Sequence, residues 1–171
     1  MGRTPLLLIP AVVLLACDRS PPVAPATPAD RPALDAVANS AGPKANGQGA
    51  FDVGTQLRTF AFNAVQQKDG EVYGHAELHN RTAGAMLHMD VDCLNIIGNM
   101  AVMSGPITHS NLPELVGLTG IFTAVDNGEG DSNDTDMLSL AYFFAPGTLT
   151  CRSGFTPPPQ PIEYGNIQVK P

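Results

Sequence analysis

The sequence predicts an all-β domain, built as an antiparallel meander of about eight short strands that forms a β-barrel or a β-sandwich. Three observations predict this class. From Gly47 onward apolar and polar residues alternate with a period of two. Turn signals recur roughly every 10–14 residues, and no stretch repeats its apolar residues with a helical period. We expect the β-domain to span 47–171, after a signal peptide at 1–16 and a flexible linker at 17–46.

The alternation defines the strands in chain order. Phe60, Phe62 and Ala64 share one face of the strand at 59–64, and the Asp69-Gly70 pair that follows suits a hairpin turn. Further turns are expected at 80–84 and at Gly98-Asn99. The predicted strands are 59–64, 72–79, 87–93, 101–107, 117–125, 137–144, 148–153 and 165–169. The inward face is expected to carry Phe60, Phe62, Leu87, Met89, Val91 and Ile121.

The first residues carry an export signal. Residues 5–16 (PLLLIPAVVLLA) are an unbroken apolar run, far shorter than the roughly 20 residues that span a bilayer but typical of a signal-peptide core. The run ends at Leu14-Leu15-Ala16-Cys17, which resembles the lipobox of bacterial lipoproteins. The resemblance implies cleavage after Ala16 and an acylated Cys17. The chain would then be anchored in the bacterial cell envelope, to the outer face of the cytoplasmic membrane or to the outer membrane. An ordinary cleaved signal followed by a chance cysteine is the alternative.

The segment after the cysteine is poor in groups that could form a core. Its prolines, at 21, 22, 25, 28, 32 and 43, stand among Ala, Ser and Val. Such a composition favours extended conformers over a packed fold, so it suits a stalk.

The charge balance excludes one class of partner. Nine Lys plus Arg stand against 16 Asp plus Glu, a formal net charge of -7. An acidic chain without a basic cluster does not fit nucleic-acid binding, and anionic lipid headgroups would repel it. Contact with the membrane is therefore expected through the lipid anchor.

Two stretches resemble a widespread class of secreted bacterial β-domains. They are FAFNAVQQKDGEVYG, and LHMDVDCLNIIGNMAVMSGPI continuing to VDNGEG. The resemblance implies an extracytoplasmic all-β domain and points to no catalytic residues.

The cysteines that remain after Cys17 are Cys93 and Cys151. An even pair in an exported domain is expected to form a disulfide. A bond across this separation would stabilise the domain by about 4 kcal/mol in the chain-entropy model. Two buried free thiols are the alternative.

An acidic loop is the first candidate metal site. Its carboxylates are Asp126, Glu129, Asp131, Asp134 and Asp136. A glycine-rich loop with several oxygen ligands can fold around calcium, although the EF-hand order of acids is missing. The alternative is a solvated hairpin loop that binds no ion.

Histidines form the second candidate. His75, Glu77 and His79 share the polar face of one predicted strand, and His88, Asp90 and Asp92 share that of the next. In a hairpin these faces adjoin, so His75, His79 and His88 could hold zinc or another divalent ion. A plain outward polar face is the alternative.

No catalytic motif accompanies these residues. The sequence has no Gly-x-Ser-x-Gly, no phosphate-cradling loop and no HExxH. We therefore expect a non-enzymatic module that binds or scaffolds a protein or glycan ligand, with no cofactor unless calcium binds. A small hydrolase or isomerase that uses a barrel cavity is the rival interpretation.

The anchor gives the first testable prediction. Cys17→Ser removes the acylated sulfur, so the domain should leave the membrane fraction and accumulate as an unlipidated precursor. Cell fractionation and N-terminal sequencing check this. A mature N-terminus at any residue other than Cys17 would contradict it.

Overall fold

The structure is a computed structural model that describes residues 42–128 and 134–171. These residues form antiparallel strands and one 3-10 turn, η2 (Pro113–Leu115), which confirms the all-β class. The strands are β1 (Lys44–Val53), β2 (Gln56–Gln66), β3 (Val72–Asn80), β4 (Ala85–Asp90), β5 (Cys93–Ile97), β6 (Met100–Ser110), β7 (Thr119–Val125), β8 (Met137–Ser139), β9 (Tyr142–Phe144), β10 (Pro159–Pro161) and β11 (Tyr164–Lys170).

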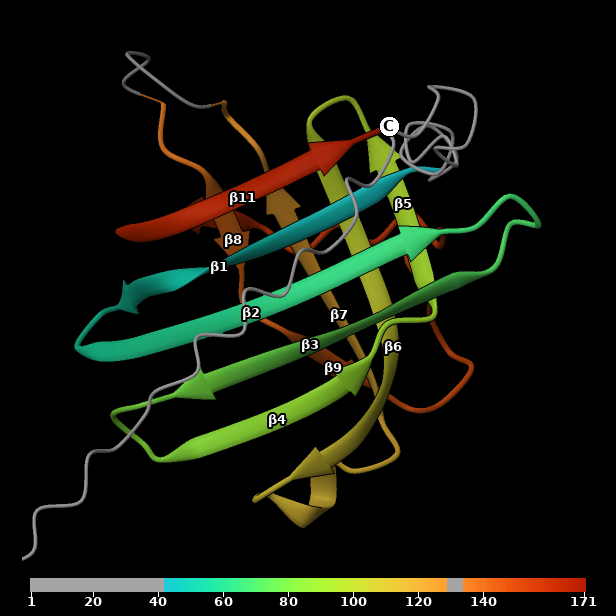
Figure 1. Cartoon of the computed structure of the whole chain (residues 1–171). Coiled ribbons are helices and arrows are strands. Elements are labelled where there is room, and N and C mark those ends of the chain that lie inside the picture. The colour runs from blue at the N-terminus through green and yellow to red at the C-terminus, as the bar shows by residue number, and fades with distance from the viewer. Residues whose placement is uncertain (1–41, 129–133) are drawn as a thin grey trace, which may run out of the picture. The chain divides into compact units, whose positions relative to one another are not determined.

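The strands follow one another in a meander with two departures. Their order is β10-β8-β7-β6-β4-β3-β2-β1-β11, with β5 added beside β6 and β9 beside β7. Hairpins join β1 through β4, and β11 returns to pair with β1. Figure 1 shows β1 to β4 and β11 in front, crossing β5, β6 and β7 behind them. The sheet thus curls over on itself as a half-barrel, between the two architectures that the sequence left open.

Strand β6 makes the corner between the two layers. Its first part pairs with β5 and β7, and its last part pairs with β4 in the front layer. At the corner, a Cβ on Gly105 would collide with the backbone carbonyl of Asp90. The register of β4 against β6 also shifts between His88 and Met89. A bulge and a glycine are the devices by which a strand changes sheets.

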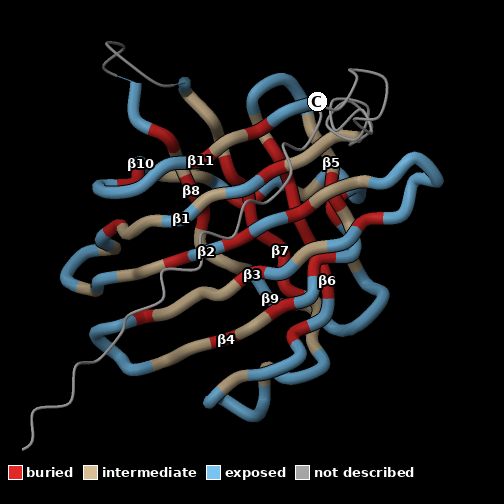
Figure 2. The backbone as a smooth tube through the Cα atoms, in the orientation of Figure 1, coloured by how far each residue is buried: buried red, intermediate tan, exposed pale blue. Residues whose placement is uncertain are grey.

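The main core lies between the layers. Phe60 and Phe62 of β2 stack at 6.1 Å, and Phe62 meets Phe122 of β7 edge-on, with ring centroids 5.5 Å apart. Figure 2 shows the buried positions concentrated where the two layers face each other. Five of the residues expected to point inward lie in this core: Phe60, Phe62, Leu87, Met89 and Val91.

Ile121 does not join them, so that expectation was wrong. Strand β7 is buried on both faces, and Phe122 rather than Ile121 faces the main core. Ile121 packs in a second cluster with Val102 and Cys151. Residues 148–153, predicted as a strand, form turns instead and supply Cys151 to this cluster. A segment that covers one face of a sheet needs apolar side chains but no backbone hydrogen bonds to a neighbouring strand. The apolar residues of 148–153 therefore resembled those of a strand.

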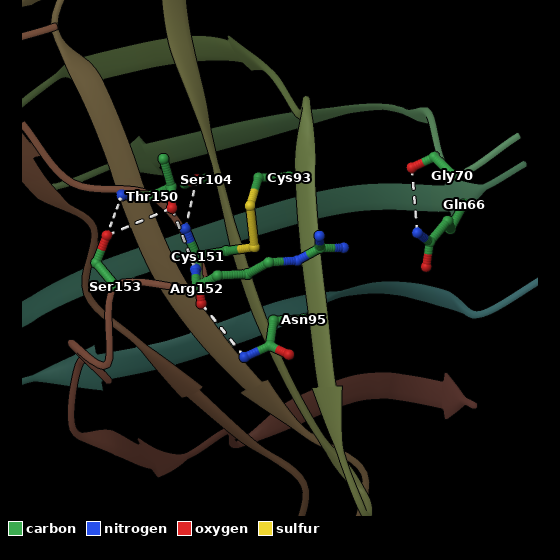
Figure 3. Close-up of a disulfide and its surroundings, with 9 residues drawn as sticks. All are labelled: Gln66, Gly70, Cys93, Asn95, Ser104, Thr150, Cys151, Arg152 and Ser153. Atoms are coloured by element: carbon green, nitrogen blue, oxygen red, sulfur yellow. Dashed lines mark hydrogen bonds between the residues drawn. A yellow bond between two sulfur atoms is a disulfide. The ribbon is translucent and has the colours of Figure 1, made fainter. Parts of the chain in front are cut away.

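A disulfide ties this covering segment to the back layer. Cys93 on β5 and Cys151 are bonded, with Cα atoms 5.7 Å apart, as predicted from the sequence. Figure 3 shows the polar contacts around the bond. The Cys151 N–H donates to Ser104 Oγ at 2.9 Å, and Asn95 Nδ2 donates to the Cys151 carbonyl at 3.4 Å. Both partners lie on β5 and β6, so the segment is held on the outer side of the back layer.

Other strand boundaries differ from the prediction for identifiable reasons. The predicted strand 137–144 divides because β8 and β9 pair with opposite ends of β7. Between them, Ser139 Oγ accepts the Thr123 N–H at 2.8 Å in place of a backbone acceptor. Similarly, 87–93 ends at Asp90 because the chain passes to β5. The sheet itself begins at Lys44, three residues before the expected domain start at Gly47.

Within the described ranges, no helix has the length and apolar character needed to cross a membrane.

The disulfide yields a prediction about stability. Replacing Cys93 and Cys151 together by alanine should lower the free energy of unfolding by about 2–4 kcal/mol, because the unfolded chain loses its cross-link. Urea unfolding followed by circular dichroism measures the change. Reduction of the unaltered chain should give a similar decrease, and an unchanged midpoint in both would contradict the prediction.

Candidate functional site

An apolar pocket lies at the end of the half-barrel where β2 begins and β3 ends. It has a volume of about 180 Å³ and is partly open to solvent. The turn η2, at the bottom of Figure 1, forms one wall. Apolar lining side chains come from both layers and from η2: Phe51, Phe60, Leu78, Ala85, Met86, Leu87, Leu112, Leu115, Leu138, Leu140, Ala141 and Phe143. A dry cavity of about 150 Å³ holds one benzene-sized molecule, so this space suits a short chain or a single ring.

One cation belongs to this pocket. Arg58 lies on the inward face of β2, in register with Phe51 of β1 and Asn80 of β3. Its Nη2 donates to Gln56 Oε1 at 2.7 Å, and Asn80 Nδ2 donates to the same oxygen at 2.9 Å. The Nε of Arg58 is buried and has no hydrogen-bond partner among the described residues.

The charge of Arg58 is likewise not balanced. Within residues 42–128 and 134–171, the contacts of 4.0 Å or less between basic and acidic side chains join Glu77 to His79 and His88 and do not involve Arg58. A guanidinium beside apolar side chains loses part of its hydration, and a buried donor left without an acceptor costs about 1–3 kcal/mol. A ligand that places a hydrogen-bond acceptor, preferably an anionic one, beside the Arg58 guanidinium would therefore be favoured in this pocket.

The alternation along β2 indicates that Arg58 faces inward, but the strand prediction did not include this residue. Position 58 has the same parity as Phe60, Phe62 and Ala64, which all face inward. Because side chains alternate between faces, an arginine in that register must meet the interior or its edge. The predicted strand began at residue 59, so the inward arginine lay just outside it.

The predicted histidine face exists and is wider than expected. Glu77 of β3 pairs with His88 of β4, which pairs with His109 of β6. Glu77 Oε1 lies 3.4 Å from His88 Nδ1, and Glu77 Oε2 lies 4.0 Å from His79 Nε2. The rings of His88 and His109 stand 5.6 Å apart. His109 was missed because the end of β6 was not expected to reach the front layer.

This row lacks the geometry of a metal centre. Among the residues that the structure describes, no three His, Cys, Asp or Glu side chains are grouped to hold an ion. His75 is exposed and opposes Asp90, so it lies beside the row and not in it. Burial lowers the pKa of His79, and the nearby Arg81 lowers it further, which keeps this ring neutral at pH 7. The described part of the face is consistent with an outward polar surface.

Two carboxylates of the acidic loop hold the edge of β11. Asp136 is buried and accepts the N–H of Asn127 at 2.8 Å and that of Ile167 at 2.7 Å. Asp126 accepts the N–H of Gly128 and of Val169, both at 2.9 Å. Among the described strands, β11 pairs with β1 alone, so these side chains satisfy donors on its free edge. They act in place of a neighbouring strand.

The rest of the loop adds less to this picture. Asp134 is exposed, and Glu129 and Asp131 lie outside the described residues. Calcium binding therefore stays a prediction, with Asp126 and Asp136 already engaged by backbone donors. Cys17 and the 1–16 signal also lie outside the described residues.

A scan against protein-family models found no match, and searches of curated proteins and of solved structures found none either.

The role of Asp136 can be tested by a single oxygen-to-nitrogen change. Asp136→Asn replaces one acceptor by an amide donor that faces a backbone N–H, so the free energy of unfolding should fall by about 1–3 kcal/mol. Asp134→Asn is the matched control, because it removes the same charge from an exposed position in the same loop. It should change the free energy by less than about 0.5 kcal/mol. Equal effects in urea unfolding would show that charge, and not hydrogen bonding, decides stability.

Proposed function

We propose that this chain is a lipoprotein of the bacterial cell envelope whose β-domain is a non-enzymatic binding module. Its binding site is the pocket between η2, the start of β4 and the β8–β9 segment. The anchor rests on the lipobox resemblance at Cys17. Binding rests on one observation, an apolar pocket that is partly open to solvent at the end of an otherwise packed core.

The lining supports a small apolar ligand over a glycan. Leucines from two separate segments converge on the pocket: Leu112 and Leu115 beside and in η2, and Leu138 in β8. Burying aliphatic surface contributes roughly 25 cal/mol per Å², whereas sugar hydroxyls would lose hydration against these walls. A ligand with an apolar body is therefore the better fit.

The rival activity, a small hydrolase or isomerase, has less support. Proton transfer or nucleophilic attack needs a titratable or nucleophilic group within hydrogen-bond reach of the substrate. Of the described residues that line the pocket, none is Asp, Glu or Cys. His79 is the titratable base among them, and its ring belongs to the outer face of β3, where Nε2 lies 4.0 Å from Glu77 Oε2. The Ser139 hydroxyl is engaged, since it accepts from Thr123 and donates to the Leu140 carbonyl at 2.8 Å. This arrangement favours binding without chemistry.

The proposal predicts that a short neutral amphiphile enters the pocket. Hexan-1-ol should shift the methyl NMR signals of Leu112, Leu115, Leu138 and Leu140 in a saturable manner. Ala141→Phe places a ring in the pocket and should abolish the shifts. Ala145→Phe, at an exposed position just beyond β9, is the matched control and should preserve them. Shifts that are absent, or that persist in Ala141→Phe, would contradict the proposed site.

A further inference from the structure

We propose that the pocket selects a carboxylate carried on a short apolar body, with Arg58 as its counter-charge. This inference rests on the proposed function, since it names the ligand class of that same pocket. The choice of ligand class follows from the hydrogen-bond partners of the polar groups in the pocket.

Most polar groups at the pocket are already engaged. Asn80 Oδ1 accepts the Ala83 N–H at 3.0 Å, and Asn80 Nδ2 donates to Gln56 Oε1. That same Gln56 oxygen also receives Arg58 Nη2, so it already serves two donors. Ser139 Oγ has both an acceptor and a donor role filled. The remaining hydrogen-bonding capacity is concentrated on the Arg58 guanidinium, whose Nε has no partner in the described chain.

A guanidinium can only donate, so the ligand group that answers it must accept. Its planar fork matches two oxygens on one atom, as in a carboxylate or a phosphate. One positive charge neutralises a carboxylate fully, whereas a phosphate monoester carries about 1.5–2 negative charges at neutral pH. With no second cation lining the pocket among the described residues, the carboxylate is the better match.

The position of Arg58 also sets where the anion sits. Arg58 is the third residue of β2, in the front layer, while Leu115 and Leu138 line the same pocket from η2 and β8. A ligand with its carboxylate at Arg58 places its chain among these leucines. The volume of about 180 Å³ accommodates a chain of roughly six carbons or one ring.

The overall negative charge of the chain cannot account for a preference for a carboxylate. A net charge of -7 repels anions at long range, so preference for a carboxylate must come from contact with Arg58. A second arginine at the same end provides a matched control. Arg81 follows β3 and donates through Nε to Thr59 Oγ1 at 2.8 Å, on the outer side of the front layer.

The test compares hexanoate with hexan-1-ol on the same protein by NMR titration at neutral pH. Hexanoate should bind about tenfold more tightly, because a hydrogen bond to a charged group contributes roughly 1.5–3 kcal/mol. Arg58→Gln should remove the preference, so that hexanoate binds no more tightly than hexan-1-ol. Arg81→Gln, which removes the same charge from the outer side, should retain the preference. The wild-type comparison needs no variant, so it remains decisive if Arg58→Gln fails to fold.

The outcomes separate this inference from the proposed function. If hexan-1-ol binds and hexanoate binds no better, the pocket stands and the carboxylate assignment is wrong. If neither ligand binds, the proposed function itself fails. Tighter binding of hexyl phosphate than of hexanoate, or loss of the preference in Arg81→Gln as well, would also overturn the assignment to Arg58 and a carboxylate.

Discussion

The fold depends on strand β6 serving two layers. Its first residues pair with β5 and β7, and its last residues pair with β4, so one continuous sheet must turn back over itself. Gly105 makes this turn sterically allowed, since any larger residue would strike the Asp90 carbonyl. The turn brings Phe62 of β2 against Phe122 of β7, and this contact lies at the centre of the apolar core. Without the shared strand, neither layer would have a partner to bury its inner face.

A half-barrel does not close, so the backbone N–H groups on the free edge of its last strand lack a partner strand. In this chain, side-chain carboxylates accept those N–H groups instead. Asp126 and Asp136 accept N–H groups from the free edge of β11, 43 and 31 residues away in sequence. Each carboxylate also binds an N–H near its own loop, so each fixes the loop to the strand. Asp126 and Asp136, which the sequence suggested as ligands of a cation, therefore hold the loop and β11 together by hydrogen bonds. Negative charge placed on backbone dipoles holds the last strand against the sheet.

The open end of the half-barrel contains the pocket for the same reason. Side chains of both layers line it, together with residues of η2, β8 and β9, and a space of about 180 Å³ stays open between them. Arg58 lines this space, where its aliphatic stem can lie on the core while its guanidinium reaches the pocket. The apolar side chains around this guanidinium offer it no hydrogen-bond acceptor, and the side-chain amides of Gln56 and Asn80 are already hydrogen-bonded. An anionic group brought by a ligand would complete it.

The sequence by itself determined which residues of β2, β3 and β4 face inward, where the hairpin turns occur and which cysteines pair. These properties depend on alternation along a few residues, on glycine in turns, and on cysteine number. It missed β1, β5 beyond Cys93 and the Pro-flanked β10, and it placed Ile121 in the wrong cluster. Only the tertiary structure decided that β7 is buried on both faces, that His109 joins the outer row, and that Asp136 meets Ile167. It alone showed that Arg58 borders a pocket. Each of these facts depends on contacts between segments far apart in the chain, and local periodicity contains no information about which distant segment will supply the partner.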